Sequence, residues 1–171
     1  LKKNIDRALE QAREYGLLGD SILGSDFNFD VEVHFDVGIF VSGESSALMR
    51  SIEGRNPEPR PKYIRTSVSG IWDKPSNLNN VETWANVPQI IEKGADWYAG
   101  IGTERSKGTK MISLSGNVVN SGVVEVPFGT TLRQIVYDIG GGVPNGKKLK
   151  AIHFGGAMGG SIPESLIDTP L

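Results

Sequence analysis

The chain opens with apolar positions that recur every three or four residues, interleaved with charged ones. This spacing predicts an amphipathic helix over residues 1–15, which the glycine at position 16 ends. Residues 17–29 are rich in Gly, Ser and Asp and are expected to form a loop.

Two strand-like segments come next. Residues 31–35 alternate strictly between apolar and polar, which predicts a half-buried strand with Glu32 and His34 on its outer side. We interpret His34 as a surface or edge residue rather than a metal ligand. The apolar run over residues 38–41 predicts a short buried strand after a break at 36–38.

The stretch that follows, Ser42-Gly-Glu44, is typical of a tight turn into a helix. Ser45 or Ser46 is expected to cap that helix, which should run to about Glu53 and end at Gly54, with Leu48 and Ile52 on its buried face. A strand that runs through a glycine turn into a helix N-terminus is where open α/β sheets bind ligands.

Residues 56–65 combine alternate prolines with basic side chains, Arg60, Lys62 and Arg65. The prolines favour an extended segment. The basic residues are either an ordinary solvated loop or a cationic rim suited to a phosphate or carboxylate.

A second polar cluster, Asn79-Asn-Val-Glu-Thr83, precedes a further helical pattern. Asn79 or Asn80 can serve as its N-cap, and Pro88 is expected to kink or restart the helix before Gly94 ends it. One cap needs one amide, so the cluster also suits hydrogen bonding to the edge of a planar ligand.

After a polar connector over residues 96–107, the pattern becomes β-rich. A hairpin, a helix with a capping box and a further strand describe a compact β-grasp-like unit. The expected elements are a strand over 110–118, a turn over 120–122, a strand over 123–126 limited by Pro127, a helix begun by Thr131-Leu-Arg-Gln134 with Leu132, Ile135, Val136 and Ile139 on one face, a glycine stop over 140–142, a strand over 150–154 and a glycine-rich stretch of tight backbone packing over 155–160.

Composition narrows the function classes. A net charge of −2 gives no basic footprint for nucleic acid, and no apolar run approaches the roughly 20 residues that span a bilayer. Cysteine is absent and histidine occurs twice, so we expect no metal site on this chain itself. No signal peptide is evident and we expect a cytoplasmic protein without direct membrane insertion.

Three stretches in the same order, 42–60, 70–88 and 108–160, resemble one family. It is the NADH-binding flavoprotein subunit of respiratory complex I and its soluble relatives, the NAD- or NADP-linked subunits of multimeric iron hydrogenases and formate dehydrogenases. The hydrogenase type is the more similar, on Ser45-Ser-Ala-Leu-Met49 and on Asn77–Pro88.

The resemblance implies an α/β fold: a partial Rossmann-like domain for FMN and NAD(P)H over residues 1–106, a β-grasp soluble-ligand-binding domain over 107–161, and a linker over 162–171. It implies a subunit that exchanges electrons between NAD(P)(H) and iron–sulfur centres through FMN, with other iron–sulfur subunits as partners. No catalytic acid or base is assigned. The implied cofactor-binding residues are Phe40, Gly43, Glu44, Ser45, Lys62, Arg65, Leu78, Asn79, Asn80 and Thr83.

Three departures from the family pattern carry expectations. Ser45 stands where the family usually has a Glu that contacts the adenosine ribose. Arg65 stands where the family has an aromatic after the Lys62 position and is a potential phosphate partner, so NADP(H) should be tolerated or preferred. The flavin-phosphate loop and the Cys-bearing 4Fe-4S domain are missing. These residues are therefore expected to be a middle section that binds FMN poorly and is inactive alone.

The sequence is also compatible with a second, non-enzymatic function. The chain could be a non-enzymatic β-grasp module for ligand binding or subunit docking, with its first half as scaffold. A flavin spectrum that bleaches with NADH or NADPH favours the enzyme.

Overall fold

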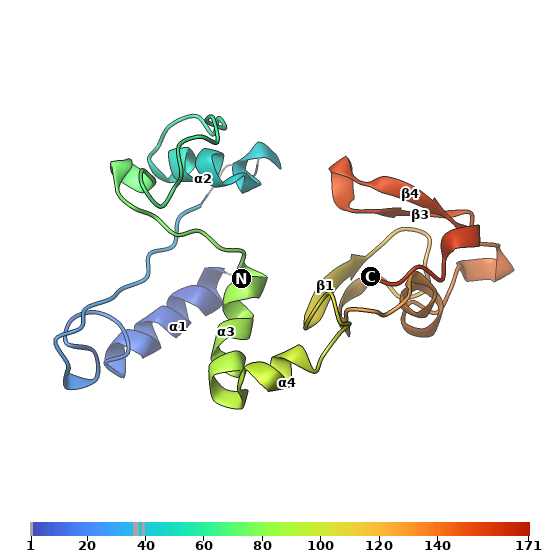
Figure 1. The fold of residues 1–171 in the computed structure, drawn as a ribbon, viewed down its shortest axis with the longest axis horizontal. Coiled ribbons are helices and arrows are strands. Elements are labelled where there is room, and N and C mark those ends of the chain that lie inside the picture. Colours follow the sequence, from blue (N-terminus) through green and yellow to red (C-terminus); the bar gives the residue numbers. More distant parts are fainter. Residues whose placement is uncertain (1, 36–37, 39) are drawn as a thin grey trace. The chain divides into compact units, whose positions relative to one another are not determined.

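The computed structural model describes residues 2–35, 38 and 40–171, and it combines helices with short strands (Figure 1). The chain forms two compact units, one ending at Leu78 and the other beginning at Asn79. Predictions that touch Leu1, Asp36, Val37 and Ile39 lie outside the described residues. The predicted domain boundary near residue 106 stays a prediction.

The first unit begins with α1, Lys2–Glu14, which confirms the predicted amphipathic helix. Gly16 follows it with a φ of +66°. Such a left-handed conformation suits glycine and stops a helix. The Arg13 side chain holds the following loop in place, because its Nε donates to Asp30 at 3.0 Å and its Nη2 donates to the Val31 carbonyl at 3.0 Å.

The two strands predicted for this unit do not occur in the described residues, so both predictions are wrong there. Val31–Phe35 forms no ladder with another described segment, and Phe35 is 67% exposed. Phe40–Gly43 is a 3-10 turn, while Ile39 lies outside the described residues. Alternation does predict that Val31 and Val33 are half-buried. A strand also needs a neighbour for its backbone N–H and C=O groups, and alternation cannot supply one.

The unit is completed by α2, Ser45–Ile52, and a set of single turns. Gly54, with a φ of +75°, ends the helix as predicted. Across both units the 3-10 turns lie at Ile22–Gly24, Phe40–Gly43, Ile71–Asp73, Pro144–Gly146, Gly156–Met158 and Glu164–Leu166.

The second unit starts with two consecutive helices, α3 over Val81–Lys93 and α4 over Ala95–Ala99. Of the predicted kink or restart at Pro88, the restart is wrong, since α3 runs on through this proline. Proline removes one backbone donor, and the helix continues on both sides of it. The polar connector expected from residue 96 is also wrong, because α4 begins directly after Gly94.

A hairpin follows, with β1, Thr109–Leu114, antiparallel to β2, Gly122–Pro127. The predicted pairing of these segments is confirmed. The first strand ends four residues earlier than predicted, because the chain turns at Gly116 with a φ of +99°.

The predicted capping box is confirmed after β2. The Thr131 N–H donates to Gln134 Oε1 at 2.9 Å, and the Gln134 N–H donates to Thr131 Oγ1 at 3.2 Å. The helix itself is a π-helix, Gln134–Ile139. Leu132, Ile135 and Val136 are buried as predicted, but Ile139 is 40% exposed. A wider turn shifts the fourth apolar position away from the face that α-helical spacing gives it.

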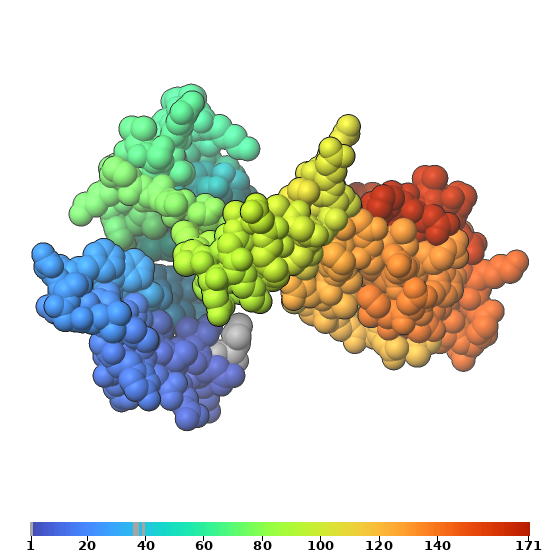
Figure 2. Space-filling view, turned by 60° about the horizontal axis from the view of Figure 1, so that its bottom comes forward, coloured from blue at the N-terminus to red at the C-terminus, as the bar shows by residue number. Residues whose placement is uncertain are grey.

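A second hairpin pairs β3, Ala151–Phe154, with β4, Gly160–Pro163. β4 was not predicted, and the glycine-rich stretch is the turn of this hairpin. The last residues then pack back: the Leu132 N–H donates to the Thr169 carbonyl at 3.2 Å, and Ile167 is 1% exposed. In the space-filling view, the part of this unit coloured orange to red forms one continuous surface (Figure 2).

The two hairpins are separate two-stranded sheets within the described residues, so a single β-grasp sheet is not observed. No described helix has the length and apolarity to cross a membrane.

Candidate functional site

The start of α2 is organised by Glu44. Its Oε2 accepts hydrogen bonds from the backbone N–H groups of Ser46, at 2.9 Å, and Ala47, at 3.1 Å. The cap was predicted at Ser45 or Ser46, and this prediction is wrong. The extended backbone of Glu44 lets its longer side chain reach the first-turn donors that a serine was expected to satisfy.

Ser46 instead joins the helix to the proline-rich segment. Its hydroxyl donates to Glu44 Oε2 at 2.5 Å and accepts from the Arg60 N–H at 2.9 Å. The Arg60 guanidinium also donates to the Ser69 carbonyl. Arg60 therefore has a structural role in this unit, which leaves Lys62 and Arg65 as the exposed cations of the predicted basic rim.

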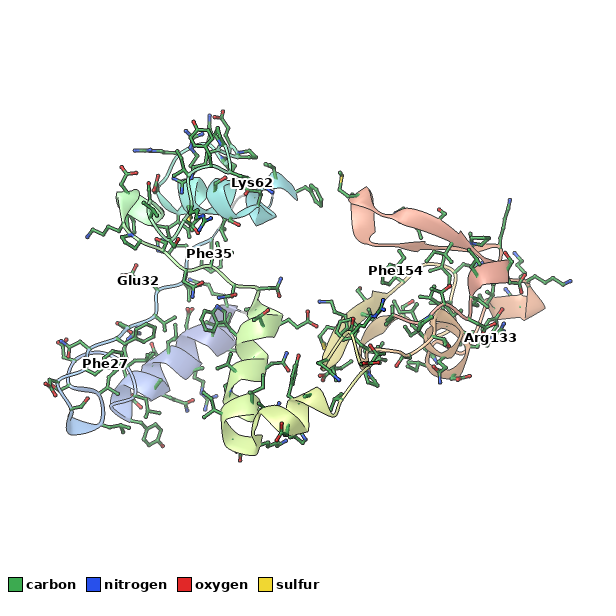
Figure 3. The ribbon with its side chains drawn as sticks, in the orientation of Figure 1. Phe27, Glu32, Phe35, Lys62, Arg133 and Phe154 are labelled. Atoms are coloured by element: carbon green, nitrogen blue, oxygen red, sulfur yellow. The ribbon has the colours of Figure 1, made fainter. Side chains whose placement is uncertain are left out.

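Glu44 carries a negative charge at neutral pH. The hydrogen bond from the Ser46 hydroxyl, together with those from the Ala47 and Ser46 N–H groups and the charge of Lys62, lowers the pKa of this carboxyl. Lys62 lies in the segment beside α2 (Figure 3). A carboxylate and a lysine thus occur together in the first unit, and both suit polar or charged parts of a nucleotide.

The turn before Glu44 has two features that its own chain does not explain. The Ser42 hydroxyl is buried, and its Oγ has no hydrogen-bond partner among the described residues. A Cβ built on Gly43 would meet no atom within 4 Å, and this glycine is not among those with a positive φ. Neither backbone conformation nor packing in the described chain requires glycine here. Sequence reasoning passed over Ser42, since a serine in a turn carries no distinctive signal.

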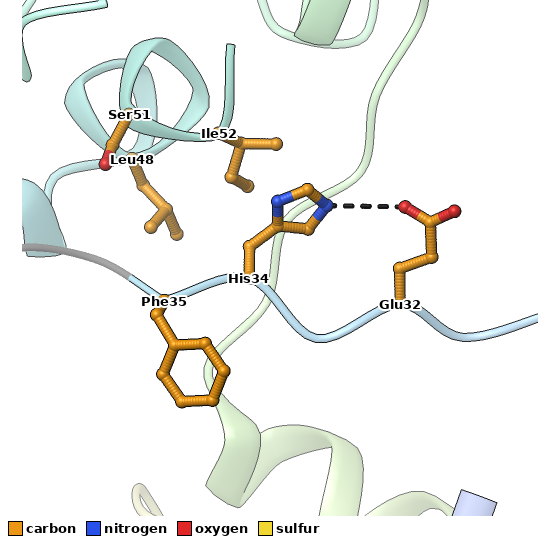
Figure 4. A pocket seen from close by; sticks show the side chains of 6 residues that line it. All are labelled: Glu32, His34, Phe35, Leu48, Ser51 and Ile52. Atoms are coloured by element: carbon orange, nitrogen blue, oxygen red, sulfur yellow. Dashed lines mark hydrogen bonds and ion pairs between the residues drawn. The ribbon is translucent and has the colours of Figure 1, made fainter. Parts of the chain in front are cut away.

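The buried face of α2 differs from the prediction. Ala47 and Met49 are buried, whereas Leu48 and Ile52 are half-buried. Leu48 and Ile52 border a cavity of about 220 Å³ instead (Figure 4), whose other lining residues are Glu32, His34, Phe35 and Ser51. His34 is exposed, with Nε2 3.4 Å from Glu32 Oε2. No cluster of three potential metal ligands occurs in the described part of the chain.

Asn80 caps α3, as one of the two predicted candidates. Its Oδ1 accepts from the Glu82 N–H at 3.0 Å. Thr83 and Asn79 are exposed and Leu78 is half-buried. The Asn80 amide nitrogen is not used by the cap, which needs only the oxygen.

Glu82 connects α3 to β1, a role that sequence reasoning missed. Its carboxylate pairs with Lys110 and accepts from the Met111 N–H at 2.7 Å. The Lys110 hydrogen bond, followed by the Met111 one, lowers the pKa of this carboxyl. Sequence reasoning could not find this contact, because a partner 28 residues away leaves no local pattern.

The predicted cofactor-binding residues fall in both units. Phe40, Gly43, Glu44, Ser45, Lys62, Arg65 and Leu78 belong to the first, and Asn79, Asn80 and Thr83 to the second. Phe40 is 74% exposed, and several other aromatic side chains of the described residues, Phe35 and Tyr63 among them, are exposed to a similar extent. That the two groups meet around one ligand stays a prediction.

Known proteins resemble the chain over nearly its whole length. It is 50% identical over 169 residues to the NADP-reducing hydrogenase subunit HndC of Solidesulfovibrio fructosivorans, and 44% identical over 168 residues to a subunit of the NADH-quinone oxidoreductase of Escherichia coli. The chain is a homologue of these oxidoreductase subunits. The family resemblance inferred from the sequence is thereby confirmed.

A solved structure gives the same result. The NAD+-reducing NiFe-hydrogenase in the H2-reduced state matches 99% of the chain at a TM-score of 0.82 and 30% identity. The homologous regions are only part of longer proteins: 34% of the S. fructosivorans protein, 38% of the E. coli protein and 28% of the hydrogenase chain. No family model matches the chain.

Proposed function

We propose that the chain forms part of a flavoprotein subunit that exchanges electrons between NAD(P)(H) and iron–sulfur clusters through FMN. The observation that carries the proposal is homology, over nearly the whole chain, to an NADP-reducing hydrogenase subunit and an NADH-quinone oxidoreductase subunit. The clusters, including a 4Fe-4S cluster, would be held by residues outside this cysteine-free chain, and iron–sulfur subunits of a cytoplasmic assembly would be its partners.

The proposal includes the domain organisation. Residues 1–106 would complete a Rossmann-like domain, 107–161 a β-grasp domain and 162–171 a linker. The mixed helix and strand fold and the structural match to the hydrogenase support this division.

The residues around the start of α2 fit a flavin nucleotide. Open space at Gly43 allows a flat ring to approach the backbone closely. FMN, when bound, supplies the hydride chemistry. In this proposal Phe40 and the turn at Gly43 hold the flavin ring. The edge of the ring contacts the Asn79 and Asn80 amides, Thr83 and Leu78.

Charged residues of the same unit would position the dinucleotide. Glu44 is held ionised, and the positive charge of Lys62 lies near it. Glu44 would hydrogen-bond a dinucleotide hydroxyl while Lys62 neutralises a phosphate. Ser45 in place of a carboxylate, together with the exposed Arg65, would admit a 2′-phosphate, which favours NADP(H).

The test is a chimeric subunit in which these 171 residues replace the aligned segment of the S. fructosivorans protein. We expect the purified chimeric subunit to show an FMN absorption spectrum that bleaches with NADPH at least as fast as with NADH. A folded chimeric subunit without flavin, beside a flavin-containing parent, would contradict the flavin proposal and favour the docking module. Bleaching by NADH alone would contradict the NADP(H) preference. The isolated chain is expected to bind FMN weakly and to have no turnover.

Asn80 allows its capping role to be separated from its proposed flavin role. Asn80→Asp keeps the capping oxygen but replaces the amide donor, whereas Asn80→Ala removes both. We expect Asn80→Ala to lower the free energy of unfolding by about 1 kcal/mol. Asn80→Asp should retain stability yet weaken flavin retention about tenfold in the chimeric subunit. Thermal melts and flavin titration measure the two effects, and full flavin retention by Asn80→Asp would restrict Asn80 to capping.

A further inference from the structure

A large cavity lies within the second unit, and no residue proposed for the flavin lines it. Its volume is about 830 Å³, and its walls come from β1, the turn after β1, the helical segment near Ile135 and the β3 hairpin. The two hairpins that flank it are separate ribbons (Figure 1). Sites for small organic molecules commonly measure roughly 300–1,000 Å³, so this volume suits one such ligand.

The inner surface of the cavity is apolar. Leu132, Ile135 and Val136 line it and are themselves buried. Half-buried side chains of both hairpins, Ile112 and Ile152 among them, line the remaining walls. Apolar surface of a ligand with a hydrocarbon or aromatic body would be removed from water against this lining, which favours binding.

The charged groups that line the cavity are all basic. Lys148, Lys150 and His153 line it, and no aspartate or glutamate does among the described residues. Phe154, the last residue of β3, also lines the cavity (Figure 3). His153 Nε2 lies 2.8 Å from the Gly156 carbonyl oxygen, so that nitrogen carries the proton and donates.

The carboxylate of Glu82, which contacts β1, does not cancel the positive charge of the cavity lining. Glu82 accepts from the Met111 N–H, but it is paired with Lys110. An anion near Lys148 and Lys150 would therefore meet two positive charges that no cavity-lining carboxylate opposes in the described chain, at the edge of an apolar interior.

We propose that this cavity binds a small amphipathic carboxylate. The apolar body of the ligand would lie against Leu132, Ile135 and Val136, and its carboxylate would bind between Lys148 and Lys150. This inference is independent of the flavin proposal, because it uses none of the residues assigned to FMN or the dinucleotide.

The test uses decanoate and decyltrimethylammonium, which share a chain length and differ in the sign of the head group. Titration calorimetry on the 171-residue chain, below the micelle concentration of each probe, should give saturable binding of decanoate at one site. The cation should bind at least about tenfold more weakly. Equal affinity for the two probes, or no saturable binding of decanoate, would overturn the proposal.

The double variant K148E/K150E should weaken decanoate binding by about tenfold or more, since it reverses both charges at the edge. Lys147→Glu is the matched control, because Lys147 is exposed and does not line the cavity. An equal loss of decanoate affinity with K147E would mean that the affinity depends only on the net charge of the protein, and it would contradict the proposed site. K148Q/K150Q replaces the double variant if charge reversal lowers the melting temperature.

Hydrogen exchange on the ligand-free chain provides a separate check. Backbone amides of β1 and β3 that face the cavity should exchange quickly without ligand and slowly with decanoate. Slow exchange of both sets in the absence of ligand would mean that the hairpins close into one sheet, and the cavity proposal would then be wrong.

Discussion

Gly43→Val is expected to abolish the flavin-dependent reaction while leaving the fold intact. In the chimeric subunit we expect NAD(P)H oxidation to fall about 100-fold or more, because a displacement of the ring by about 1 Å is enough for such a loss. The cause is the open space at Gly43, where a side chain would contact nothing in its own chain but would occupy the proposed position of the ring. Because the backbone needs no glycine there, the free energy of unfolding should change by about 1 kcal/mol or less.

Gly122→Val is the matched control for this experiment. Gly122 also lacks a positive φ and has open space at its Cβ, but it lies at the start of β2. It should retain both flavin and turnover. Normal turnover of Gly43→Val would contradict the proposed contact, and unfolding of Gly43→Val would contradict the local geometry described for the turn.

Gly159→Ala is expected to lower stability strongly, in contrast to Gly43→Val, because the added methyl group would clash with atoms of the chain itself. A Cβ at this position would lie 1.8 Å from the Phe154 carbonyl oxygen and 2.8 Å from the Gly155 Cα. Both are backbone atoms, so the β3–β4 turn must open to admit the methyl group. We expect a loss of about 3 kcal/mol or more, and a fall in melting temperature of roughly 6–12 °C.

The neighbouring Gly160→Ala serves as the control, since its Cβ would meet no atom within 4 Å. Its melting temperature should stay within about 2 °C of the parent. Hydrogen exchange of the β3 and β4 amides gives the local readout, and should rise in Gly159→Ala alone. The φ of Gly159 is −84°, so conformational preference cannot account for the loss. Equal stability of the two variants would disprove the tight turn.

Sequence predicted well the features that depend on residues close together in the chain. Amphipathic spacing with a glycine stop identified α1, and the reciprocal bonds of Thr131 and Gln134 were predicted from their separation alone. The pairing of β1 with β2 followed from two apolar runs around a short polar connection. The family was evident from motifs around Gly43 and Asn80, which homology over nearly the whole chain confirms.

Sequence failed where the outcome depends on distant partners. Residues 31–35 alternate between apolar and polar side chains, but no described strand pairs with them. They therefore form no β-ladder, and Phe35 is exposed. Glu82 bonds to Lys110 and Met111 across a long separation, and this contact has no local signature.

The sequence by itself determined the glycine stops of α1 and α2, the capping box, one hairpin and the family, because each rests on contacts within a few residues or on a recognisable order of motifs. Tertiary structure decided that Glu82 joins α3 to β1, that Ser42 has a buried hydroxyl without a partner in the described chain, and that an apolar cavity lined by lysines lies beside β3. Burial and the direction of a side chain are set by what packs around it, and those neighbours come from anywhere in the chain.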